Sequence, residues 1–158
     1  QRIWVERSGP VRPGDRVLAK AQLRSYRGEL RTETLTVNVP ASAAPGDYTL
    51  LVCDADTLNG VEQRELRQPF APRDLDQLLK AINGLRHRHH LYARLLRPSP
   101  GVIVAGEYLP GLPPSALAVL GARSSANLPL RSATAWELDL PTEQAVSGAR
   151  SLTLTISR

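Results

Sequence analysis

The chain has 158 residues, which is enough for one ordinary domain with a hydrophobic core. Its 42% hydrophobic and 22% charged residues lie close to globular averages and argue against wholesale disorder. No apolar run approaches the roughly 18 residues that a membrane span needs, and no hydrophobic signal-peptide core is present. Because methionine is absent, we expect Gln1 to begin a mature or excised fragment.

The first half of the chain predicts three β-strands. Apolar and polar residues alternate over residues 17–24 and again over 30–39, as they do in half-buried strands. Residues 26–29 suit a hairpin connection between these two runs. A third, apolar run covers residues 48–53. Short strands separated by proline and glycine, as these are, are typical of a β-sandwich.

The middle of the chain predicts helix before strands return. Residues 71–84 end at Gly84, which suits a helix terminus. They carry an apolar stripe at helical spacing, formed by Leu75, Leu78, Leu79 and Ile82. Further along we expect strands at 91–96 and 102–105, a short helix at 113–120, a loop at 122–132, and strands at 135–140 and 151–157.

Two passages, residues 37–52 and 138–156, share the order strand, proline, polar loop, glycine, strand. Bacterial immunoglobulin-like sandwiches often have this form. We therefore predict a mainly β fold of the α+β class, with residues 1–158 as a single immunoglobulin-like β-sandwich domain. An α/β insertion with two short helices, at about 70–122, is expected to interrupt it. The predicted core consists of Val17, Leu23, Leu35, Val37, Leu50, Val52, Leu75, Leu78, Leu79, Ile82, Leu95, Val104, Leu138, Leu152 and Leu154.

Positive charge is concentrated in the stretch LRHRHHLYARLLR at residues 85–97. It holds all three histidines, four arginines and no acidic residue, and residues 77–106 account for the whole net charge of +5. Its candidate ligand-binding residues, for a glycan or an anionic polymer, are Arg86, Arg88, Tyr92 and Arg94. A solvated basic connection between helix and strand is the simpler interpretation.

The histidine cluster also raises the question of a metal site. On a strand His87 and His89 share a face, whereas on a helix His87 and His90 do. In either case a tetrahedral zinc site lacks two ligands, and Arg86 and Arg88 repel a divalent cation. We therefore expect no metal and no other cofactor.

Specific nucleic-acid recognition is not expected either. If residues 91–97 form a strand, Arg94 and Arg97 lie on opposite faces and do not make one basic stripe. Tyr92 is the one aromatic residue in the basic stretch, so the stacking platforms that bind single strands are missing. Non-specific contact with phosphate stays open.

The sequence carries no recognisable catalytic motif. It lacks a G-x-S-x-G elbow, an H-E-x-x-H helix and a phosphate-binding glycine loop. Cys53 lies in an apolar run without a neighbouring histidine, which predicts a small buried hydrophobe. Residues 54–62 hint at a calcium loop, but Leu58 occupies a ligand position, so capping of a turn by Asp and Asn is the simpler interpretation. We expect no enzymatic activity from this chain.

Three stretches together resemble a known family, at residues 11–29, 75–120 and 136–156. The most specific parts are LRSYRGE at 23–29 and GEYLPGLPPS at 106–115. Their order is similar to the C-terminal region of large bacterial proteins that carry a SpoIVB-like serine peptidase domain near the N-terminus. The glycine-rich motif around the nucleophilic serine of that peptidase is absent here. The resemblance therefore implies a non-catalytic accessory domain of an exported, peptidase-like protein, and an extracytoplasmic location.

Three functional hypotheses remain. The first is an interaction domain that recognises a protein partner, or other domains of the same parent chain, through its surface. The second is a module that binds a glycan or an anionic polymer through the basic region at 86–97. The third is an enzyme with a dispersed site. A contiguous exposed apolar patch favours the first hypothesis, whereas a deep pocket with convergent polar groups favours the other two.

Overall fold

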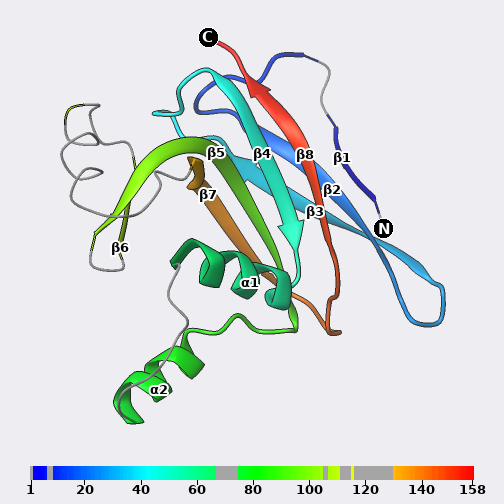
Figure 1. The fold of residues 1–158 in the computed structure, drawn as a ribbon. Helices are drawn as coiled ribbons and strands as arrows, with labels where there is room; N and C mark the ends of the chain where they lie inside the picture. The colour runs from blue at the N-terminus through cyan, green and yellow to red at the C-terminus, as the bar shows by residue number, and fades with distance from the viewer. Residues whose placement is uncertain (1, 7–8, 67–74, 105–106, 111–114, 116–129) are drawn as a thin grey trace.

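The computed structural model describes residues 2–6, 9–66, 75–104, 107–110, 115 and 130–158 (Figure 1). A three-stranded antiparallel sheet has the order β1 (Arg2–Val5), β2 (Arg16–Arg24), β3 (Leu30–Asn38). The second sheet is also antiparallel and has the order β8 (Ala149–Ile156), β4 (Gly46–Cys53), β5 (His90–Val104), β7 (Leu130–Pro141). β6 (Glu107–Pro110) pairs with the far end of β5. Two helices, α1 (Ala55–Leu66) and α2 (Leu75–Asn83), lie between β4 and β5 in the chain.

Alternation of apolar and polar residues explains the first sheet. Val17 lies opposite Val37, and Ala19 lies opposite Leu35; all four side chains are buried. The intervening polar residues turn outward, since successive side chains of a strand point to opposite faces. In the turn before β2, Gly14 adopts a φ of +86° after Pro13, as the third residue of a type II turn requires.

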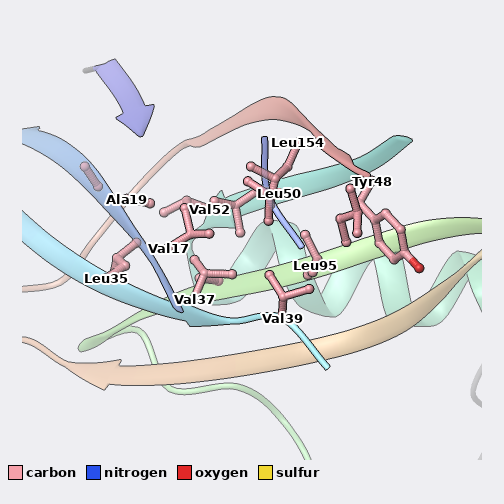
Figure 2. Packing of buried hydrophobic residues seen from close by; sticks show 14 of the residues in the cluster. Val17, Ala19, Leu35, Val37, Val39, Tyr48, Leu50, Val52, Leu95 and Leu154 are labelled. Atoms are coloured by element: carbon pink, nitrogen blue, oxygen red, sulfur yellow. The ribbon is translucent and has the colours of Figure 1, made fainter. Parts of the chain in front are cut away.

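The two sheets face each other across one hydrophobic core, to which β2, β3, β4, β5 and β8 all contribute (Figure 2). Leu50 and Leu95 bring the second sheet against Leu35 and Val37 of the first. Each of these side chains is fully buried, so each contributes about 1.5–3 kcal/mol of hydrophobic stabilisation. This shared core fixes the ends of β4 and β5, where the candidate site lies.

Most of the predicted core is confirmed. Seven predicted residues are buried: Val17, Leu35, Val37, Leu50, Val52, Leu95 and Leu154. Three more pack against them in half-buried positions: Leu23, Leu138 and Leu152. The side chain of Val104 lies outside the described residues.

The prediction is wrong for α2. Its apolar stripe is exposed rather than buried, with Leu75, Leu78, Leu79 and Ile82 at 67%, 38%, 48% and 53% of their accessible surface. The helical spacing correctly predicted an amphipathic helix, but amphipathicity does not say which surface the apolar side meets. α2 lies beyond α1 and away from both sheets (Figure 1).

The mainly β character is confirmed, and several boundaries differ from the prediction. α1, β1 and β6 were not expected, and the strands predicted at 91–96 and 102–105 form one strand, β5. β5 falls inside the predicted insertion at about 70–122, yet it is a central strand of the second sheet, between β4 and β7. β7 begins at Leu130, earlier than the predicted start at residue 135. Except for Ser115, the helix predicted at 113–120 lies outside the described residues.

Candidate functional site

α1 begins at a well-defined cap directly after β4. The carboxylate of Asp54 accepts hydrogen bonds from the backbone N–H groups of Thr57, at 2.6 Å, and of Gly148, at 2.6 Å. The first of these bonds is the usual N-cap interaction, and it confirms capping as the role of this aspartate. Burial would raise the pKa of Asp54, but these hydrogen bonds outweigh it and hold the pKa below its usual value. The cap ties α1 to the start of β8.

α1 then packs on the ends of β4 and β5 and presents Glu62 to the arginine-rich stretch. Leu58 and Ala55 form a small buried cluster with Cys53 and Tyr92. Because the helix is anchored by this cluster and by its cap, Glu62 is held one turn further along, at the surface of β5.

Two arginines and two glutamates form an alternating ring of ion pairs, here called the Arg–Glu quartet: Arg86, Glu62, Arg94 and Glu137. Arg86 contacts Glu62 at 2.8 Å and Glu137 at 2.9 Å. Arg94 contacts Glu137 through Nε at 2.8 Å, and it also pairs with Glu62. Each guanidinium therefore touches both carboxylates, and the two positive charges are balanced by the two negative ones.

The quartet favours the charged forms of Glu62 and Arg86. Burial would raise the pKa of Glu62, but hydrogen bonds and the positive charges of Arg86 and Arg94 lower it below its usual value. The hydrogen bond to Glu62 in turn raises the pKa of Arg86. Arg94 is only 7% exposed, so its charge depends on these partners rather than on water.

Tyr92 anchors the turn that precedes β5. Its ring is 1% exposed, and the Arg86 guanidinium lies 5.5 Å from the ring centre. The phenol oxygen accepts a hydrogen bond from the His87 N–H at 2.8 Å, and its O–H donates to the His87 carbonyl at 3.3 Å. The Arg86 N–H donates to Asn59 of α1 at 3.0 Å, so the turn is fixed on both sides.

The structure brings three of the four predicted ligand-binding residues together, namely Arg86, Tyr92 and Arg94. Arg88 lies apart from them; its side chain is 72% exposed and contacts Asp56 at 3.3 Å. Ligand binding by these residues stays a prediction. Any anion at Arg86 or Arg94 would compete with carboxylates that are already in contact.

Sequence reasoning missed the acidic half of this site. Glu62 and Glu137 are 75 residues apart in the sequence and both far from the basic stretch, so no local pattern connects them to it. The signal that could have indicated acidic partners was the concentration of positive charge at residues 85–97. A strand-forming stretch with several arginines and no acid needs carboxylates from other elements if any arginine is to be buried.

The histidines and the cysteine have structural surroundings. His90 pairs with Asp139 through Nδ1, and its ring stacks on Tyr92 with centroids 6.1 Å apart. Within the described residues, no three histidine, cysteine or acidic side chains are grouped as metal ligands are. Cys53 is buried, as predicted, and burial raises the pKa of its thiol to about 11.

Two further surface features stand out. The apolar stripe of α2 continues into Leu85, which is 46% exposed. A cleft of about 620 Å³ lies between the β2–β3 hairpin and the β7–β8 connection. Its charged lining is largely paired internally, since Arg31 contacts Glu33 at 2.7 Å and Glu143 at 3.2 Å.

The described fold thus defines a mainly β protein of two antiparallel sheets with helices beside them. Comparisons with protein-family models, with curated proteins and with solved structures find no significant match to this chain. None of the helices in the described part has the length and apolarity of a membrane span.

Proposed function

We propose that this chain is a non-catalytic interaction domain that acts by surface recognition, within an exported, peptidase-like bacterial protein. The exported and peptidase-like setting follows from the sequence resemblance alone. We also propose that the two facing sheets form an immunoglobulin-like sandwich. Such folds serve mainly as rigid carriers for binding surfaces on their connections and edges, and here the connection between β4 and β5 carries both helices.

The exposed apolar stripe of α2 is the observation that supports this function. Leu75, Leu78, Leu79 and Ile82 occupy positions i, i+3, i+4 and i+7 of one helix, and each keeps more than a third of its surface in contact with water. This is the pattern by which an amphipathic helix binds in an apolar protein groove. We propose that the partner offers such a groove, either in a separate protein or in another domain of the parent chain.

The Arg–Glu quartet supports this setting rather than an anion-binding role. It fixes the turn between α2 and β5, so α2 projects from a rigid base instead of from a free loop. The alternative of a glycan or anionic polymer at residues 86–97 has weaker support. Of the four candidate residues, Tyr92 and Arg94 are buried, and Arg86 already contacts two carboxylates.

A paired-variant binding experiment tests the proposal. The variant Leu79→Glu places a charge in the middle of the stripe, and Leu18→Glu places one on β2, at a residue that is similarly exposed at 44%. Proteins retained by immobilised wild-type chain from an extract of the source organism are identified, purified and titrated against all three forms. Because anchor residues of such helices dominate affinity, we expect Leu79→Glu to weaken binding by about 2 kcal/mol or more, roughly thirtyfold.

The control variant should bind like the wild type. Equal affinity of all three forms for every purified partner would contradict the proposal. So would a partner whose affinity falls only with Leu18→Glu. Circular dichroism of the two variants checks that both remain folded, which their exposed positions lead us to expect.

A further inference from the structure

β3 is an edge strand whose outer backbone groups have no strand partner in the described part of the chain. It pairs with β2 alone and is the last strand of its sheet (Figure 1). Unpaired N–H and C=O groups along a strand edge form a template for another strand. The question is which strand fits this template.

The other four sheet edges of the described fold carry features that protect them. β1 and β6 have four residues each. The β8 edge is met by the chain at Val11, which forms a parallel bridge with Ile156. β7 ends at Pro141 and pairs irregularly with β5. β3 has nine residues in unbroken register with β2, and it contains neither proline nor lysine, which commonly guard edges.

The direction of the free groups follows from the hairpin. The Ser25 N–H donates to the Glu29 carbonyl, and the Val39 N–H donates to the Asp15 carbonyl. Since hydrogen-bonded and non-hydrogen-bonded pairs alternate in an antiparallel ladder, the odd-numbered residues of β3 bond to β2. The even-numbered residues therefore direct their backbone groups to the open edge: Leu30, Thr32, Thr34, Thr36 and Asn38.

We propose that the β3 edge pairs antiparallel with the β3 edge of a second copy of this chain, with Thr34 on the twofold axis. In this register the two β3 strands overlap over their whole length. The outward backbone N–H and C=O groups of one copy meet those of the other, and Thr32 lies opposite Thr36 of the second copy. Cross-strand threonine pairs stabilise such ladders, and all three threonines are exposed in the single chain.

Charge disfavours the register whose axis lies one residue earlier. Moving the axis by one residue, to Glu33, places two glutamates directly opposite each other, which is destabilising. With the axis at Thr34, Arg31 lies opposite Val37 and Glu33 opposite Leu35 of the second copy, so no like charges meet. The Arg31–Glu143 contact near the start of β3 involves two exposed side chains, which can move aside.

The dimer should be weak, because one strand pair buries less than the roughly 1,600 Å² of a standard interface. Its test is the molar mass in solution, measured by analytical ultracentrifugation over a wide concentration range. The wild type should dimerise with increasing concentration. Thr34→Lys, which sets two lysines across the axis, should raise the dissociation constant about tenfold or more. Thr153→Lys, the same change at an exposed residue of β8, should leave it unchanged.

Cysteine variants test the register independently. Across the axis, two residues at position 34 lie about 5.5 Å apart between Cα atoms, within the range of a disulfide. Two residues at position 36 lie about 14 Å apart, well outside it. Oxidation should therefore link Thr34→Cys into a covalent dimer and leave Thr36→Cys monomeric, and the buried Cys53 does not compete.

Three outcomes would overturn the proposal. One is a wild-type chain that stays monomeric at every concentration. Another is a dimer that tolerates Thr34→Lys but dissociates with Leu79→Glu, because the second copy would then bind through α2. The third is a disulfide that forms as readily at position 36 as at position 34.

Discussion

The Arg–Glu quartet makes a quantitative prediction through the variant Glu62→Gln. This change keeps the shape of the side chain but removes the charge that faces both Arg86 and Arg94. At an effective dielectric constant of about 20, two opposite unit charges 4 Å apart attract each other by roughly 4 kcal/mol. This figure does not include the cost of removing both groups from water. Glu137 still contacts both arginines in the variant, so the loss should be well below the roughly 3–5 kcal/mol seen when a buried charge loses its partner.

We therefore expect Glu62→Gln to reduce the free energy of unfolding by about 2 kcal/mol. Urea denaturation at neutral pH measures it as a lower midpoint at unchanged slope. The matched variant Glu143→Gln changes a side chain that is 82% exposed. It should lower the free energy of unfolding by no more than about 0.5 kcal/mol. A loss at Glu62 as small as that of the Glu143 control would show that the charge of Glu62 does not stabilise the quartet.

The pH dependence of this effect has a definite sign. The pKa of Glu62 is lowered in the folded state from its usual 4.5, so its contribution is fully present above pH 4.5. It is lost as the pH falls through the lower, folded-state pKa. The stability difference between wild type and Glu62→Gln should accordingly shrink in acid, and a difference that grows with acidification would contradict the assignment.

Three further predictions test the surrounding structure. Asp54→Ala removes the α1 cap and the bond to Gly148, and it should lower stability by about 2 kcal/mol in a urea titration, with the deficit shrinking below pH 3.8. The Cys53 thiol should resist a disulfide reagent at pH 8 in the folded protein and react at once in urea, because burial raises its pKa to about 11; rapid labelling without urea would contradict this. Leu95→Ala should lower the free energy of unfolding by about 2–5 kcal/mol, since Leu95 is fully buried. Leu79→Ala should lower it by less than about 0.5 kcal/mol, since Leu79 is 48% exposed. Equal losses would show that α2 packs on a core.

Local pattern predicted the strands well and the placement of the helices poorly. Alternation located β2 and β3, because each of these strands turns one face to the core, and an apolar run located β4. It could not locate α1, whose sequence ADTLNGVEQREL has few apolar residues and no continuous stripe. α1 is held instead by its Asp54 cap and by contacts of Leu58 with Tyr92, both of which depend on tertiary structure.

The candidate site shows the same division between local and long-range information. The sequence identified the arginines, because charge concentrates at residues 85–97. It could not identify their partners, since Glu62 comes from a helix that was not predicted and Glu137 from a strand more than 40 residues further along. Pairing across elements turned a predicted basic surface into a neutral anchor for the turn before β5. The stripe of α2 was recognised from its spacing, but its exposure was not.

The most direct test of the proposed recognition surface is photo-crosslinking from position 79 in the native extract. A photoreactive residue replaces Leu79 in one variant and the similarly exposed Leu18 of β2 in another. We expect a discrete adduct with one heterologous protein segment from position 79, lost on competition with unlabelled wild-type chain, and no such adduct from position 18. Absence of a competed adduct at position 79, or the same adduct from both positions, would contradict recognition through α2.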